Sequence, residues 1–113
     1  MKRHAIVFTC IFLAAPALAQ DEREESCGYQ GQVASAIREA RLDGVKENRV
    51  ESEILSGNPG WPATYNRSIP VLAGWVYQID RKLLRDNDVG ALWRQQCIDN
   101  WDTIQEMMQQ QSG

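Results

Sequence analysis

The sequence has little histidine and little phenylalanine. Its one histidine, His4, and both of its phenylalanines, Phe8 and Phe12, lie near the N-terminus. A chain that lost this end would have no histidine, which excludes Ser-His-Asp and Cys-His catalysis and the usual zinc sites that contain histidine. The sequence also lacks a cluster of lysines and arginines, and this argues against binding to nucleic acid or to an anionic membrane surface.

The sequence shows no alternating strand pattern, no internal repeat and no apolar run long enough to span a bilayer. Its N-terminal apolar run, Ala5 to Leu13, is about nine residues long, within the range of a signal-peptide core. A positive start precedes this run, and the small-x-small pattern read by a signal peptidase follows it. We therefore predict a signal peptide over 1–19, cleaved between Ala19 and Gln20, and export to a bacterial periplasm or to the outside.

Cleavage at this site would leave 94 of the 113 residues, enough for one small domain that is not attached to a membrane. It would also remove Lys2 and Arg3, which lowers the formal net charge from −3 to −5. Two alternatives keep the chain at the membrane: a retained anchor, and a lipid attached to Cys10. The second needs a small residue just before the cysteine, and Thr9 fits that requirement poorly.

Two cysteines, Cys27 and Cys97, would remain after cleavage. In an exported protein an even number of cysteines indicates a disulfide. This disulfide would close a loop of about 70 residues and stabilise the fold by about 4 kcal/mol in the chain-entropy model. Two free thiols or two metal ligands are the alternatives, but a metal site would need further ligands, and no histidine would remain to supply them.

The apolar residues of 68–84 recur at steps of three and four, so this stretch is predicted to be a central helix covered by the others. Where it begins is open. One continuous helix from Pro62 would be kinked at Pro70. Alternatively, a short helix over 62–66 precedes one capped by Ser68, and this is preferred because proline is favoured early in a helix. The predicted central face consists of Ile69, Leu72, Trp75, Val76, Ile79 and Leu83.

Helices are also predicted on both sides of this stretch. One runs from near Ser26 to Gly44, which suits the left-handed conformation that ends a helix. A shorter helix covers 47–56 and ends in a loop rich in glycine and proline. The last helix covers 89–108, after a polar turn that supplies its N-cap. The candidates for this N-cap are Asp86 and Asp88.

These elements predict an all-α fold, a small bundle of three to four helices tied by one disulfide. The single helical domain covers 27–108. A flexible acidic leader over 20–26 precedes it, and a frayed tail over 109–113 follows it.

Three residues are candidates for binding a partner. Trp61 stands at the exit of a loop, where it is either an exposed anchor or buried. Arg41 lies one turn after Arg38, near a helix end. Its guanidinium either contacts an anionic group of a partner or has a structural role, bonding carbonyls at a helix end or pairing with an acid. The remaining tryptophans fall on apolar helix faces and are predicted to pack in the core: Trp75, Trp93 and Trp101.

Other patterns that carry chemistry are weak. The stretch 86–90 begins like a calcium loop, but an EF-hand would need different residues at Gly90, Ala91 and Cys97. Two carboxylate pairs share helix faces, a spacing that is common on solvated surfaces. We therefore predict no catalytic residue, no metal site and no cofactor. The two pairs are Glu47 with Glu51 and Asp99 with Asp102.

Cys27, the stretch Ala40-Arg41-x-x-Gly44-Val45, Val76-Tyr77 and Trp93-x-x-x-Cys97 together form a pattern. It resembles a group of short exported proteobacterial proteins, in which a cysteine opens a helix ending in Ala-Arg-x-x-Gly and an aromatic residue precedes a closing cysteine. The resemblance covers 27–97. It implies a helical fold with a disulfide, and it implies no activity.

The expected function is that of a small non-enzymatic periplasmic protein that binds another envelope protein. Two alternatives remain. The chain is similar in size and architecture to periplasmic acid-stress chaperones, which would loosen at low pH and expose apolar surface. A hydrolase would need a concave site lined by paired carboxylates.

Overall fold

The structure is a computed structural model that describes the backbone of residues 15–111 and the side chains of 21–107, 109 and 110. Within these ranges every regular element is a helix, which confirms the all-α class. No helix of the described part is both long and apolar enough to cross a membrane. The predicted signal peptide falls mostly outside the described residues, which include only the backbone of its end, 15–19.

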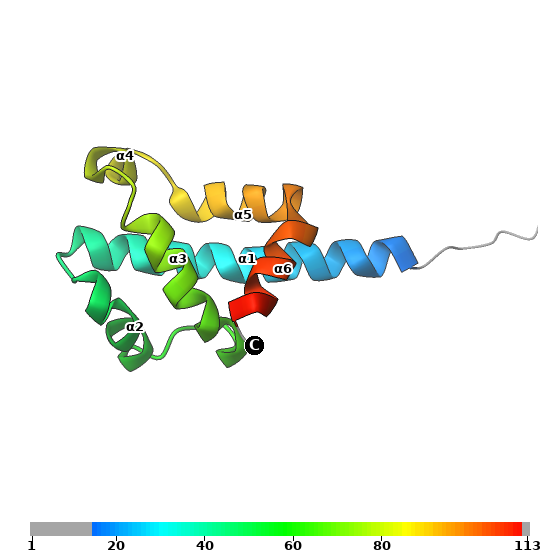
Figure 1. Cartoon of the computed structure of the whole chain (residues 1–113), viewed down its shortest axis with the longest axis horizontal. Helices are drawn as coiled ribbons and strands as arrows, with labels where there is room; N and C mark the ends of the chain where they lie inside the picture. The colour runs from blue at the N-terminus through cyan, green and yellow to red at the C-terminus, as the bar shows by residue number, and fades with distance from the viewer. Residues whose placement is uncertain (1–14, 112–113) are drawn as a thin grey trace, which may run out of the picture.

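The described part contains six α-helices and one 3₁₀ helix, more than the three to four helices predicted. Helix α1 forms the long axis, α5 runs beside it in the opposite direction, and α3 and α6 cross it (Figure 1). In chain order the elements are α1 (Ala15–Leu42), α2 (Glu47–Ser56), η1 (Ala63–Arg67), α3 (Ser68–Val76), α4 (Arg81–Asp86), α5 (Val89–Asp99) and α6 (Trp101–Gln111).

Helix α1 begins earlier than the sequence pattern indicates. We predicted a start near Ser26 after a flexible leader over 20–26, and this was wrong because α1 passes through the leader without a break. The residues of 17–27 include no glycine or proline, and their charged side chains are good helix formers. After cleavage at Ala19, helix α1 would begin at the new N-terminus.

The end of α1 and the whole of α2 agree with the predictions. Gly44 adopts the left-handed conformation, with φ of 88°, and it directs the chain away from α1. Helix α2 covers the predicted residues, Glu47–Ser56, and only its Val50 is buried. The first alternative for the next segment, one kinked helix from Pro62, is replaced by η1 followed by α3, with Pro70 in the first turn of α3.

The predicted central helix over 68–84 is wrong in its second half. Helix α3 ends at Val76, and a short turn leads to α4. The side chain of Asp80 caps α4 by accepting hydrogen bonds from the N–H groups of Lys82 and Leu83, at 3.0 and 3.4 Å. Because this break rotates α4, Leu83 is 57 % exposed instead of lying on the apolar face, and Leu84 is buried.

The predicted last helix over 89–108 is also divided. Asp88, one of the two predicted N-caps, accepts a hydrogen bond from the N–H of Ala91 and opens α5. Asn100 ends it, with φ of −121° and ψ of 33°, and both its backbone N–H and its side-chain Nδ2 donate to the carbonyl oxygen of Gln96. Helix α6 then continues to Gln111, through most of the predicted frayed tail.

The predicted disulfide joins Cys27 of α1 to Cys97 of α5, and the structure confirms it. The two Cα atoms lie 5.5 Å apart, and both side chains are fully buried. Trp93 lies one turn before Cys97 on α5, and the centroid of its ring is 5.2 Å from that of Trp75. Trp93 is buried, whereas Trp75 and Trp101 are half-buried. The core therefore lies between α1, α3 and α5.

Candidate functional site

The guanidinium of Arg41 has a structural role at the end of α3. Its Nη1 donates hydrogen bonds to the carbonyl oxygens of Val76 and Ile79, both at 2.5 Å. The guanidinium carbon also lies 5.5 Å from the ring centroid of Tyr77, within the range of a cation–π contact. The carbonyl oxygen of Val76 also accepts from the backbone N–H of Ile79, at 3.2 Å, whereas that of Ile79 accepts from Arg41. Arg41 therefore closes the turn after α3.

Two further arginines bond to helix ends in the same way. Arg38 donates from Nε to the carbonyl oxygen of Leu84 and from Nη2 to that of Arg85, at 2.7 and 2.9 Å. Arg81 of α4 donates back to the last carbonyls of α1, at 3.2 and 3.3 Å. These three guanidinium groups are therefore directed at the backbone, and the predicted partner-binding residues Arg38 and Arg41 hold α1, α3 and α4 together.

Tyr77 completes this contact between α1 and α3. Its hydroxyl donates to the carbonyl oxygen of Val45 at 2.6 Å. Burial raises the pKa of Tyr77 above its usual value of 10.0, the positive charge of Arg41 opposes this shift, and the negative charge of Glu47 adds to it. The phenol is thus held in its neutral, donating form.

Trp61 is not an exposed anchor. Its side chain is 8 % exposed and belongs to the core, and its Nε1 donates to Oδ1 of Asn66 at 2.8 Å. The bond to Asn66 satisfies the one polar atom of the indole, which explains why the ring can be buried next to an otherwise polar loop. The expectation that Trp61 contacts a partner is therefore withdrawn.

The carboxylates, unlike the three arginines, are mostly without partners in the described part of the protein. All 15 aspartates and glutamates lie among the described side chains, and all of them are exposed. None forms a salt bridge with a described lysine or arginine. Three accept hydrogen bonds within a helix or at its start, namely Asp80, Asp88 and Asp99. The described side chains include 15 acids and ten lysines or arginines, so the surface has a net negative charge that no ion pair among them offsets.

A hollow of about 250 Å³ lies where α6 passes over α1 and the start of α3. We call it the polar hollow, because every residue that lines it carries a hydrogen-bonding side chain. Glu22, Ser26 and Gln30 come from α1, Gln105 comes from α6, and the remaining wall is formed by η1 and α3. The residues of this wall are Thr64, Tyr65, Arg67 and Ser68.

Two side chains of the polar hollow are almost fully buried. Gln30 is 5 % exposed; its Nε2 donates to Oγ of Ser26 at 3.2 Å, and its Oε1 accepts from Nε1 of Trp93 at 3.1 Å. Ser68 is 4 % exposed, and its hydroxyl forms no hydrogen bond with any residue described. Ser68 therefore differs from its predicted role: it lies inside the helical segment and does not cap α3.

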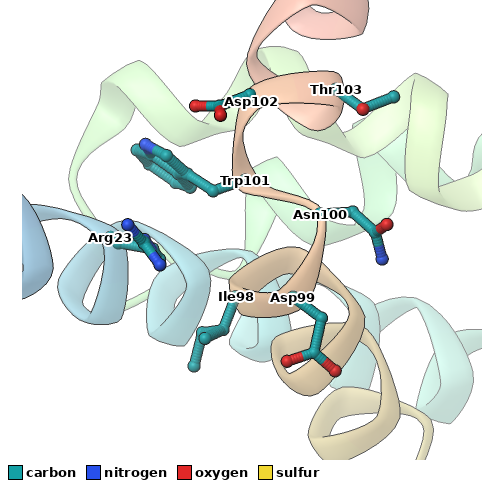
Figure 2. A pocket seen from close by; sticks show the side chains of 7 residues that line it. All are labelled: Arg23, Ile98, Asp99, Asn100, Trp101, Asp102 and Thr103. Atoms are coloured by element: carbon teal, nitrogen blue, oxygen red, sulfur yellow. The ribbon is translucent and has the colours of Figure 1, made fainter.

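A second hollow, of about 200 Å³, lies at the elbow between α5 and α6. Figure 2 shows Arg23 of α1 and Trp101 reaching toward one another on one side of the elbow, while Asn100 and Thr103 point to the other side. The Nε of Arg23 is buried without a hydrogen-bond partner in the described part. Asp99 and Asp102 also line it, so this hollow offers charges of both signs.

The predicted carboxylate pairs do not form an enclosed site. Glu47 and Glu51 are both exposed on α2. Asp99 ends α5 and accepts a hydrogen bond from Gln95, whereas Asp102 belongs to α6. Within residues 15–111 no three His, Cys, Asp or Glu side chains are grouped closely enough to hold a metal ion.

Comparison with known proteins yields no family: no family model, no curated protein and no solved structure matches the chain.

The polar hollow was not predicted from the sequence, although one signal for it was present. Gln30 occupies an apolar-face position of α1, one turn after Cys27 and one turn before Ala34, and a polar residue there needs buried partners. Ser68 gave the opposite signal, because serine before a proline-containing apolar run is typical of an N-cap.

Proposed function

We propose that the protein is an exported, non-enzymatic binding protein that associates with a basic envelope protein in the periplasm or outside the cell. The observation that carries this proposal is the surface of 15 exposed carboxylates without a salt bridge among the described residues. A net surface charge of one sign steers a partner of the opposite sign and selects against others.

The use of the arginines strengthens this argument. Arg38, Arg41 and Arg81 direct their guanidinium groups at backbone carbonyls, so they do not neutralise neighbouring carboxylates. A surface that kept its acids only for solubility would be expected to hold some of them in ion pairs with these cations. The disulfide is compatible with an oxidising location, which agrees with the proposed export.

The test is capture of partners from an envelope extract by the mature protein, with identification by mass spectrometry. We expect a basic protein that is retained at low salt and released at about 0.5 M salt, where the Debye length is only several ångströms. Capture that does not depend on salt, or partners that are acidic, would contradict the proposal.

Matched variants can locate the surface. Replacing the exposed acids of 21–25 by their amides removes charge from the start of α1, and replacing those of α2 removes charge from the opposite part of the fold. We expect one of the two replacements to reduce capture, and the other to serve as the control for a general loss of charge. Equal retention by both variants and the unmodified protein would oppose a specific acidic contact.

A further inference from the structure

The floor of the polar hollow contains hydrogen-bonding capacity that the protein leaves unused. The hydroxyl of Ser68 has no partner among the described residues although its side chain is 4 % exposed. The side-chain oxygen of Gln30 accepts one hydrogen bond and its amide nitrogen donates one, so the second amide N–H is free to donate. Ser26 accepts from Gln30 and retains its own O–H for donation. Polar groups that line a hollow bond to water when it is empty, and a ligand can supply the same hydrogen bonds.

The rim of the same hollow carries one charge of each sign. Glu22 lies on the α1 side and Arg67 on the η1 side, and both are exposed. They do not form a salt bridge with one another or with any other described residue. Two opposite charges that border one hollow without meeting leave room for a group that touches both.

We propose that the polar hollow binds a small zwitterion of the amino-acid type, with its carboxylate on Arg67 and its ammonium on Glu22. A guanidinium is suited to bind a carboxylate through two parallel hydrogen bonds. The hydroxyl and amide groups of the floor then contact a short polar side chain. The volume of about 250 Å³ lies below the roughly 300–1,000 Å³ typical of pockets for drug-sized ligands, which favours a ligand of this size.

Ligands of other charge fit less well. A simple anion would bond to Arg67 and be repelled by Glu22, and a simple cation would bond to Glu22 and be repelled by Arg67. A neutral sugar could bond to the floor but would leave both rim charges without a partner. This proposal concerns a small molecule and does not rest on the proposed binding of an envelope protein, so either can fail without the other.

The experiment uses the mature, oxidised protein and titrates it with L-serine, followed by calorimetry and by backbone amide NMR shifts. We expect saturable binding, with the largest shifts at Ser26, Gln30 and Ser68. Serine methyl ester has only the ammonium and N-acetyl-L-serine only the carboxylate, so each should bind at least about tenfold more weakly. No saturation up to about 10 mM L-serine, or equal binding of N-acetylglucosamine, would overturn the proposal.

Variants assign the contacts. Arg67→Gln and Glu22→Gln should each weaken L-serine binding by about tenfold, and Ser68→Ala should weaken it by a similar factor. The matched controls change exposed residues of α2 and should leave binding unchanged. They are Arg49→Gln, Glu51→Gln and Ser52→Ala. Ser68 is buried, so its variant is first checked for an unchanged melting temperature, and the two rim variants test the proposal even if that variant is unstable. Binding that survives both rim changes would overturn it.

Discussion

Gly31 of α1 and Gly90 of α5 face each other across the contact that also holds the disulfide. A Cβ atom placed on Gly31 would lie 2.8 Å from the carbonyl oxygen of Gly90, and one placed on Gly90 would lie 2.7 Å from that of Gly31. Both distances are shorter than side-chain carbons tolerate, so the two helices approach as closely as they do only because both positions are glycine.

Gly90→Ala is therefore expected to destabilise the protein by about 2 kcal/mol, because the new methyl group would overlap both Gly31 and the hydroxyl of Ser35. Gly28→Ala is the matched control. It lies on the same helix as Gly31, nothing stands within 4 Å of its added Cβ, and alanine is the better helix former by about 1 kcal/mol. Urea denaturation of the two variants should shift the midpoint in opposite directions, and shifts of the same sign would contradict the close contact.

Arg41→Ala should lower the free energy of unfolding by about 3 kcal/mol, because the carbonyl oxygens of Val76 and Ile79 lose a charged donor and only that of Val76 keeps a backbone N–H partner. Arg49→Ala, an exposed position on α2, removes the same charge and should change stability little. The melting temperature and the capture of envelope proteins are measured on both variants. If Arg41→Ala lost capture but kept its melting temperature, the structural role of Arg41 would be wrong.

The disulfide should be inaccessible in the native protein, because both cysteine side chains are fully buried. We expect no alkylation of native oxidised protein, and alkylation of both cysteines only after reduction in denaturant. The double variant Cys27→Ser/Cys97→Ser should lose about 4 kcal/mol of stability.

The predicted signal peptide is tested by mass analysis of the protein purified from its native host. We expect a chain that begins at Gln20, and an intact leader would refute the predicted cleavage.

Tyr77 should make the stability depend on pH in the alkaline range. Burial, the largest cause, raises its pKa in the folded state above the usual 10.0. Its contribution to stability is therefore fully present below about pH 10 and is lost as the pH rises through the folded-state pKa. Denaturation at increasing pH should show this loss, and Tyr77→Phe should reduce it while Tyr29 and Tyr65 remain as internal controls.

Acid distinguishes the proposed function from the chaperone alternative. Without salt bridges among the described residues, acid would remove mainly the capping bonds of Asp80 and Asp88, each worth about 1 kcal/mol. We therefore expect little binding of a hydrophobic dye at about pH 3. Strong dye binding there, together with suppression of client aggregation, would favour the chaperone.

Helix class and several boundaries could be predicted because they depend on local signals. The left-handed Gly44, the extent of α2 and the N-cap Asp88 each follow from residue type and spacing within one turn. The disulfide followed from cysteine count and the predicted export.

The breaks at Asp80 and Asn100 could not be obtained from periodicity, since apolar residues keep a helical spacing on both sides of each break. Asp80 could have been recognised as an N-cap by its residue type. The burial of Trp61 could not, because it depends on the bond to Asn66. The hollow depends on α6 folding back over η1, an arrangement that no local pattern encodes.

The disulfide closes the chain from Cys27 to Cys97 into a covalent ring, and α6 follows after this ring. Gln105, the contribution of α6 to the polar hollow, therefore lies on a helix that the disulfide does not hold and that is anchored by Ile104 in the core. Local opening of α6 alone would expose the hollow and leave the disulfide-tied helices folded, so ligand exchange and global unfolding would have separate rates.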